Sequence, residues 1–440
     1  MASTGSMLIT LTAGMTFSFT GTLLPQISEY VNDDKKTWLV SVNVLCMPLG
    51  GLTSPFLSRR LGKKKCLMLG NVLSFLGWLT LSVASNLSTF LIGCAIVGFS
   101  SGFTSNVSVP YLIEIPERRL RGSVAALNST FQMVGIFVGH LLNLLLPWWS
   151  ALRASSVVPI LSLCFIILSP ESPNWLLHQG RFEEAKRNFF WVRGVNAETE
   201  EEFDLLLSRH MLDMGWKKSG VFQNLVSRKF LVPFFILAIM FGVQMGSGAD
   251  VVTVFIVDML KDLSKELDAH TTIIFDMVAI MSCMFSCYLM RKVPRRPLFF
   301  SSAIATILSL LGLAAVVTFQ LPTIYVILCM CAYTAALNIG VVPVTWLSLG
   351  EVYPEVTRDV GVTLTVMYYS FVTFILVNTV PLLIHRVNIV AALYLFAGLV
   401  FAFSCVSYFI MPETKQCTLE QVEDEICKKK LFQKKPNPIN

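Results

Sequence analysis

Two glutamates in this sequence are each followed, seven residues later, by an arginine. Glu114 precedes Arg121, and Glu351 precedes Arg358, so the arrangement recurs at an offset of 237 residues. A guanidinium can donate two parallel hydrogen bonds to one carboxylate, which makes such pairs strong. Each glutamate lies where an apolar stretch ends, and an unpaired carboxylate is costly there. We therefore expect two ion pairs that can form and break; the alternative is that these charges simply face water at helix ends.

Two aspartates, Asp250 and Asp276, are the only acids that lie well inside long apolar stretches. A charged side chain at that depth in a membrane costs at least about 2.5–3.5 kcal/mol, so both are functional candidates. Asp250 could accept a hydrogen bond from a hydroxyl group of a solute, bind a cationic solute or take up a proton. For Asp276 the open alternatives are a polar partner on a neighbouring span or a position nearer the outer surface.

The sequence contains no sign of an enzyme. No nucleophile–base pair, metal-ligand cluster or phosphate-binding loop has a suitable context. None of the eleven cysteines falls in an expected external loop, so we expect no disulfide framework. We therefore predict no catalytic residue, no metal and no cofactor.

The composition points to a chain that is embedded in a lipid bilayer. Hydrophobic residues make up 54% of the 440 residues and charged residues only 14%, whereas soluble domains carry about 25% charged residues. The mean hydropathy is +0.66. These values argue against a water-soluble protein, a nucleic-acid-binding protein and a disordered chain.

We expect an all-α membrane protein, because backbone groups in lipid must pair within helices or closed barrels, and barrel-like alternation is absent. Twelve stretches are long and apolar enough to approach the roughly 20 residues that one span needs. They are 7–24, 37–57, 66–84, 89–113, 124–146, 155–168, 231–257, 271–290, 298–319, 324–349, 362–384 and 389–411.

Lysine and arginine set the expected orientation. With the N-terminus in the cytoplasm, 28 of the 34 basic residues fall on the inside and six on the outside. Both termini are then cytoplasmic. The expected organisation is a six-helix bundle at 1–177, a linker with short helices at 178–229, a second six-helix bundle at 230–411, and a cytoplasmic tail at 412–440.

Basic turns recur between the two expected bundles, as the glutamates do. The segment RRLGKK at 59–64 follows the second span, and RKVPRR at 291–296 follows the eighth. Further motifs follow the sixth and twelfth spans: PESPNWLL at 170–177, and PETK at 412–415. Together with YLIE at 111–114 and with Trp346 before Glu351, this pattern resembles the sugar porter family of the major facilitator superfamily. The short first external loop resembles that of insect facilitated trehalose transporters.

The resemblance implies the major facilitator fold: twelve helices, a substrate cavity between the halves, and alternating access. It implies a cytoplasmic gate formed by Glu114, Arg121, Glu351, Arg358, Arg60, Arg295, Glu171 and Glu413. It also implies a sugar site at Gln132, Gln244, Asp250, Asn338 and Trp346. Amides suit this role because they donate to and accept from hydroxyls without adding charge. The alternatives are contacts between helices for the two glutamines and plain packing for the tryptophan.

Several positions depart from the family pattern. Met245 stands where the family has a second glutamine, and Asp250 stands where asparagine is usual. Arg59 and Arg291 replace the aspartates of the basic turns, which puts the strength of the inside gate in doubt. The pair Tyr369-Ser370 takes the place of an Asn-Trp pair. These changes put ordinary hexose recognition in doubt.

We predict facilitative transport of a sugar, a hexose or trehalose, across the plasma membrane by a monomer. Residues 14–24 of the first span contain no acid, which argues against the usual proton coupling. Two alternatives remain: a proton-coupled or cationic-solute transporter that uses Asp250, and a transport-dead sugar sensor.

Overall fold

The computed structural model describes residues 2–26, 33–115, 121–216, 227–255, 269–353 and 358–413. Throughout these ranges the regular structure is helical, and no strand occurs in them. The first part contains α1 (Ala2–Gln26), α2 (Asp33–Leu61), α3 (Lys63–Ser82), α4 (Leu87–Glu114), α5 (Arg121–Leu145), α6 (Trp148–Ser155) and α7 (Val157–Ile167). The linker contains α8 (Pro173–His178), α9 (Phe182–Arg193) and α10 (Ala197–Trp216).

The last part contains α12 (Arg228–Gly246), α14 (Ala269–Lys292), α15 (Arg295–Thr318), α16 (Thr323–Ala336), the π-helix η1 (Leu337–Val341), α17 (Val342–Glu351), α18 (Arg358–Arg386) and α19 (Ile389–Ile410). Eight helices of the described ranges are long and apolar enough to cross a membrane. A bent pair, Phe230–Gly246 with Ala249–Phe255, meets the same criteria with an angle of 41° between its halves, and makes nine if it is one span. The chain is therefore a multi-pass membrane protein.

The sixth expected span begins earlier than the sequence suggested. Its membrane-crossing helix covers Trp148–Ile167, with a slight break at Ser156 between α6 and α7, whereas we expected 155–168. Arg153 misled the prediction because a charge usually marks the end of a span. Its side chain is exposed and its guanidinium lies 5.2 Å from the ring centroid of Trp149, so the charge is accommodated on a helix.

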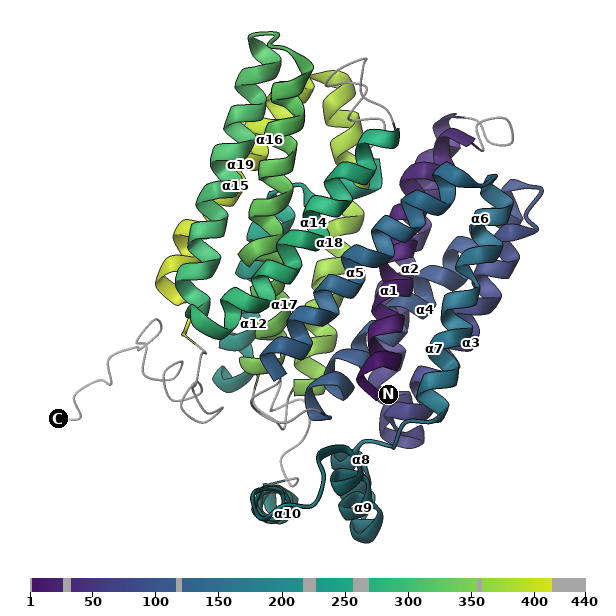
Figure 1. Cartoon of the computed structure of the whole chain (residues 1–440), viewed down its shortest axis with the longest axis vertical. Helices are drawn as coiled ribbons and strands as arrows, with labels where there is room; N and C mark the ends of the chain where they lie inside the picture. The colour runs from purple at the N-terminus through teal and green to yellow at the C-terminus, as the bar shows by residue number, and fades with distance from the viewer. Residues whose placement is uncertain are drawn as a thin grey trace, which may run out of the picture.

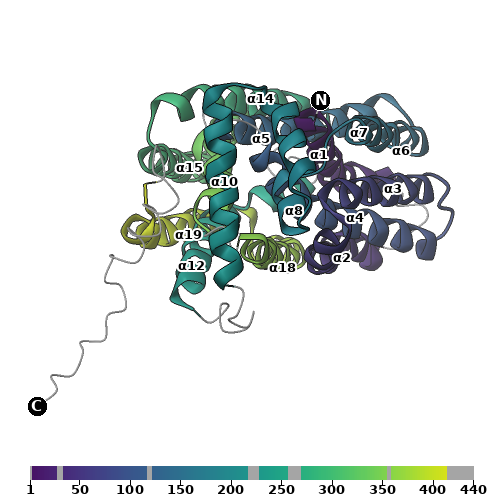
Figure 2. The same cartoon turned by 90° about the horizontal axis from the view of Figure 1, so that it is seen from below.

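The helices gather in two groups, which we call the first group (α1–α7) and the second group (α12–α19). Figure 1 shows the two groups side by side, with α5 against α14 and the linker helices α8–α10 beyond one end. Figure 2, a view from that end, shows α2 next to α18. We call this end of the molecule the linker end. The two helix pairs α5/α14 and α2/α18 therefore form much of the boundary between the groups.

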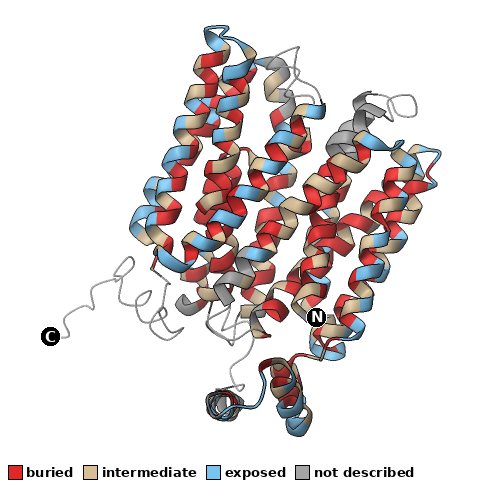
Figure 3. Ribbon diagram, viewed as in Figure 1, coloured by how far each residue is buried: buried red, intermediate tan, exposed pale blue. Residues whose placement is uncertain are grey.

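Burial follows this arrangement. Figure 3 shows buried residues concentrated inside the groups and along their boundary, with exposed residues on the outer faces. Large apolar side chains such as Phe401 and Phe409 of α19 are 62% and 70% exposed. Such exposure would be unfavourable in water over so large an area, and it suits a surface that contacts lipid.

Candidate functional site

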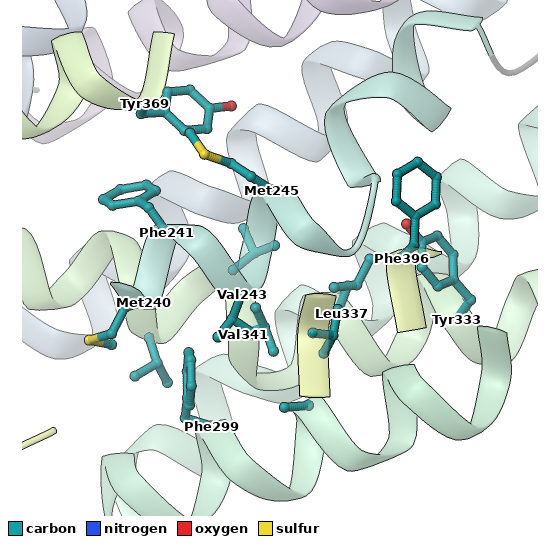
Figure 4. Packing of buried hydrophobic residues seen from close by; sticks show 14 of the residues in the cluster. Met240, Phe241, Val243, Met245, Phe299, Tyr333, Leu337, Val341, Tyr369 and Phe396 are labelled. Atoms are coloured by element: carbon teal, nitrogen blue, oxygen red, sulfur yellow. The ribbon is translucent and has the colours of Figure 1, made fainter. Parts of the chain in front are cut away.

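A break between α12 and the helix Ala249–Phe255 shapes one wall of the site. The backbone turns at Gly248, whose φ of +76° is strained for any residue with a side chain. A Cβ at this position would lie 2.6 Å from the ring of Phe396. Tyr333 Oη donates a 2.8 Å hydrogen bond to the carbonyl of Ser247, which satisfies an acceptor that the break frees (its ring is seen beside Phe396 in Figure 4). The break places Gln244 and Asp250 around one chamber.

A second irregular helix shapes another part of the wall. The five residues of η1 form a single π-helical segment between α16 and α17. Pro343 lies in the first turn of α17 and has no N–H to donate back into η1, which favours the change in hydrogen-bonding pattern. Gly340 approaches α15 so closely that a Cβ would lie 2.5 Å from the Leu298 carbonyl oxygen. This segment carries Asn338 to the same chamber.

The chamber lies between the two groups. It has a volume of about 100 Å³, and a neighbouring chamber of about 60 Å³ lies beside it. Phe17, Gln132, Trp346 and Tyr369 line both. All five residues predicted for the sugar site, Gln132, Gln244, Asp250, Asn338 and Trp346, line the larger chamber.

The predicted site residues differ in how much hydrogen-bonding capacity they have left. Gln244 is 3% exposed, and its Oε1 is buried without a hydrogen-bond partner. Asn338 already donates from Nδ2 to the Thr334 carbonyl at 2.9 Å, and its Oδ1 lies 3.5 Å from Cys283 Sγ. Gln244 is therefore the better placed of the two to bond a bound molecule.

Asp250 is tied to α18 by two neutral donors. Its Oδ1 accepts from Tyr369 Oη at 3.0 Å, and its Oδ2 accepts from Thr373 Oγ1 at 3.2 Å. No lysine or arginine of the described residues pairs with it. Tyr369 belongs to the pair that replaces the family's Asn-Trp pair, and Asp250 replaces the family's asparagine. One replacement residue therefore donates a hydrogen bond to the other, so the two departures from the family pattern contact each other.

An aromatic cluster forms the remaining wall. The ring of Trp346 meets Phe241 and Tyr369 edge to face, with centroid distances of 5.3 and 5.4 Å. Met245, which replaces the second glutamine of the family pair, is 2% exposed and packs in the apolar core beside these rings (Figure 4). The wall presents an apolar face to the chamber, which suits the apolar face of a sugar ring.

His140 was missed by the sequence reasoning, which considered only acids. It lies on α5, and its Nδ1 is 2.7 Å from Asp276 Oδ2 on α14. The partner on a neighbouring span that we left open for Asp276 is thus present. The rule that ionisable residues inside spans are functional candidates applies to histidine too, and would have found it.

The two gate glutamates form ion pairs with residues of the basic turns. Glu114 contacts Lys63 Nζ, and its Oε2 accepts from Ser172 Oγ at 2.5 Å. Glu351 Oε1 lies 3.3 Å from Arg295 Nη2. Because α3 and α15 begin directly at these turns, their first basic residues reach the ends of α4 and α17. Each of these two contacts lies within one group, so neither pair crosses the boundary between the groups.

The expected arginine partners, Arg121 and Arg358, take part in neither of these two contacts. The side chain of Arg121 lies outside the described residues, so its pairing with Glu114 stays a prediction. Arg358 Nε and Nη2 are buried without hydrogen-bond partners, so an ion pair with Glu351 is not made through these atoms. The side chain of Arg60 is exposed in the last turn of α2.

Glu171 and Glu413 have equivalent roles at helix N-termini. Glu171 Oε1 accepts from the Lys64 amide at 3.0 Å, at the start of α3. Glu413 accepts from the amides of Arg295 and Arg296, each at 3.0 Å, at the start of α15. A carboxylate at this place satisfies free amides and interacts favourably with the helix dipole. Burial raises the pKa of Glu171, and the amide hydrogen bonds act against that rise.

We expect Glu171→Ala to lower the stability of the protein by about 1–2 kcal/mol, because the first turn of α3 loses its acceptor. Glu171→Gln should cost less, since the amide oxygen can still accept. The midpoint of thermal unfolding of the purified protein measures both. Glu201→Ala, exposed in the second turn of α10, is the control and should leave the midpoint unchanged. Equal midpoints for all three variants would contradict the capping role.

A polar chamber enclosed between two groups of membrane-crossing helices is the arrangement of a solute carrier, which binds its cargo inside the membrane. The sequence comparison makes this class more specific. The chain belongs to the sugar (and other) transporter family, whose model matches residues 8–426. Members of this family are transporters and not enzymes, in agreement with our expectation.

Relatives and solved structures extend this result. The chain is 27% identical over 431 residues to the facilitated trehalose transporter Tret1 of Bombyx mori, covering 96% of this chain and 84% of that protein. It is 27% identical over 407 residues to Tret1 of Apis mellifera ligustica, covering 89% and 80%. The proton:xylose symporter XylE bound to 6-bromo-6-deoxy-D-glucose superposes with a TM-score of 0.83 at 20% identity, covering 96% and 99%. The inward-open conformation of XylE from E. coli superposes with a TM-score of 0.77 at 19% identity, covering 96% of this chain and 98% of that chain. The fold is that of the major facilitator superfamily.

Proposed function

We propose that the protein is a facilitative sugar carrier that works by alternating access. Its twelve spans form two six-helix bundles at 1–177 and 230–411, joined by the linker at 178–229 and followed by the tail at 412–440. The presence of helices at all twelve expected ranges, and their gathering into two groups, supports this organisation. A monomer suffices, because one chain encloses the chamber, and we place both termini in the cytoplasm at the plasma membrane.

The lining of the chamber supports a neutral polyhydroxylated cargo. Gln132 and Gln244 offer amides, Asp250 offers acceptor oxygens, and Trp346 offers an apolar edge. The observation that carries the proposal is the unpartnered Oε1 of Gln244, because a buried acceptor without a partner is costly unless a ligand or water supplies a donor. A sugar hydroxyl supplies that donor.

The size of the site bears on which sugar is carried. One water molecule takes up about 30 Å³ in the liquid, so 100 Å³ corresponds to about three waters. That space is smaller than a hexose, so the chamber must widen when a sugar enters. The neighbouring chamber, which Gln132 and Trp346 also line, adds room beside it. Trehalose, the cargo named for the insect relatives, would occupy both chambers.

The contacts at the linker end support a gate in which ion pairs stiffen each bundle and do not join the two bundles. Lys63–Glu114 and Arg295–Glu351 hold the cytoplasmic ends of each bundle rigid, with Glu171 and Glu413 fixing the adjacent helix starts. Rigid ends allow each bundle to move as a body, as alternating access requires. Arg60, Arg121 and Arg358 complete this gate in the proposal.

We expect the protein in vesicles to move labelled trehalose or glucose down its gradient at equal pH on both sides and with a protonophore present. The absence of acids from residues 14–24 is the reason to expect no proton requirement. Vesicles without protein are the control. Uptake that needs a proton gradient would favour the second candidate below, and binding without flux would favour a transport-dead sensor.

One observation favours a second candidate, a proton-coupled or cationic-solute transporter. Asp250 lies in the chamber with neutral donors only, so among the described residues it has no basic group to balance its charge. A proton or a cationic cargo would balance it. Asp250→Asn separates the two functions: sugar flux survives if the carboxylate only accepts hydrogen bonds, and is lost if the charge is required.

A further inference from the structure

The contact between His140 and Asp276 joins the two helix groups. His140 belongs to α5 of the first group and Asp276 to α14 of the second, and Nδ1 and Oδ2 are 2.7 Å apart. The side chains are only 1% and 8% exposed. The pair is therefore buried at the boundary where the two groups meet (helices α5 and α14 in Figure 1).

The pair lies toward the end of the molecule opposite to the linker end. His140 is in the last two turns of α5, which ends at Leu145, and Asp276 is in the first two turns of α14, which begins at Ala269. Both residues also line the larger chamber, where Gln132 lies two turns deeper on α5. The pair thus stands between the chamber and the surface at that end.

A second polar contact crosses the boundary at the same end. Ser41 Oγ of α2 donates to Asn378 Oδ1 of α18 at 2.6 Å. Ser41 lies in the early turns of α2 and Asn378 in the last turns of α18. Both helix pairs of the boundary, α5/α14 and α2/α18, are therefore joined by a hydrogen bond at the end away from the linker.

A buried histidine–carboxylate pair is a poor choice for a permanent contact. Desolvation of two polar or charged groups consumes much of what their attraction gains, and apolar packing would hold helices equally well. His140 Nε2 adds to this cost, because it is buried without a partner. When the groups separate at this end, water reaches all of these atoms and removes the cost. The contact is thus suited to forming and breaking repeatedly.

We propose that His140 and Asp276 are the outer gate of the carrier. They make contact each time the chamber closes at the end away from the linker, and they separate each time it opens there. Both are positioning residues that set the balance between two conformations. The inference rests on the proposed function, since it assumes alternating access.

The test measures how easily a reagent enters the chamber from that end. Cys283 is a native reporter: it lies two turns beyond Asp276 on α14, is 1% exposed, and its Sγ is 3.5 Å from Asn338 Oδ1 in the chamber wall. A membrane-impermeant thiol reagent is applied to sealed vesicles from one face at a time, without sugar. Mass spectrometry then gives the labelling rate of Cys283 alone.

We expect His140→Ala and Asp276→Ala each to raise Cys283 labelling from the outer face on the order of fivefold or more, because the open conformation gains population. The reciprocal swap, His140→Asp with Asp276→His, should return the rate to within about twofold of the parent. Ser162→Ala is the matched control. The substitution removes a buried 3.0 Å hydrogen bond from Ser162 Oγ to the Gly5 carbonyl within the first group. Ser162 lines neither chamber, so the labelling rate of Cys283 should stay unchanged.

An unchanged labelling rate of Cys283 in the single variants would contradict the proposed outer gate. So would an equal rise in labelling from the linker-end face, or a double swap that fails to restore the parent rate. If a single variant does not fold, the double swap and Asp276→Asn provide the test. Cys283 must be labelled at the parent rate in the double swap and faster than in the parent in Asp276→Asn. Labelling needs no cargo, so a wrong sugar assignment would abolish uptake in the vesicle assay and leave this result intact.

Discussion

Gln244→Leu is expected to raise the KM for sugar uptake about tenfold while the empty protein becomes no less stable. The Oε1 of Gln244 is buried and unpartnered, so its removal takes away an unsatisfied acceptor in the empty chamber. In the loaded chamber the same change removes a hydrogen bond to a sugar hydroxyl, worth about 1–1.5 kcal/mol, and 1.4 kcal/mol corresponds to a factor of ten. Uptake kinetics and thermal unfolding midpoints measure the two effects.

The neighbouring residue provides the control for this prediction. Met245 lies on the same helix but packs in the core, so Met245→Leu should change stability by less than about 1.5 kcal/mol and leave the KM unaltered. A fall of several degrees in the unfolding midpoint of Gln244→Leu, with an unchanged KM, would show instead that the glutamine joins helices and does not touch cargo.

Gly248→Ala is expected to destabilise the protein by about 2–5 kcal/mol and to abolish most uptake. The left-handed backbone costs a residue with a Cβ about 1–2 kcal/mol, and overlap with a packed ring costs about 1–3 kcal/mol more. The new Cβ would lie 2.6 Å from the Phe396 ring, which is 1% exposed and has little room to move. Because the break at Gly248 positions Gln244 and Asp250, the chamber should lose its shape even where the fold survives.

Gly398→Ala is the control for this substitution. Gly398 lies on α19, two residues from Phe396, and a Cβ there meets no atom within 4 Å. Alanine should therefore be neutral or stabilising by up to about 1 kcal/mol in that helix. Similar unfolding midpoints and similar uptake for the two variants would contradict the role of the break. Both proteins are compared as purified samples and in vesicles.

The helix positions could be read from the sequence because apolar length is a local property. The linker helices α9 and α10 also lie within 178–229, where we expected short helices. The error at the sixth crossing arose from Arg153, since a local pattern does not show that a charged side chain can lie over a tryptophan ring. The short helix α8 was missed because six residues carry too little pattern.

The partners of the charged residues could be predicted only in part. The repeat at 237 residues identified Glu114 and Glu351 as paired residues, but their observed partners, Lys63 and Arg295, come from the basic turns. The sequence separation of seven residues favoured Arg121 and Arg358 in the prediction. Which cation reaches a carboxylate depends on how neighbouring helices pack, and spacing along one segment does not contain that information.

By itself the sequence determined that this chain is a helical membrane protein with a repeated set of charged ends, and its resemblance to the sugar porters identified five of the residues that line one chamber. Those features follow from hydropathy, charge placement and short motifs, which are local. Only the tertiary structure decided that His140 meets Asp276, that Tyr369 and Thr373 hold Asp250, and that a break at Gly248 turns the wall. Each of these contacts joins helices far apart in the chain or depends on a backbone turn, so it arises from the packing of helices against one another.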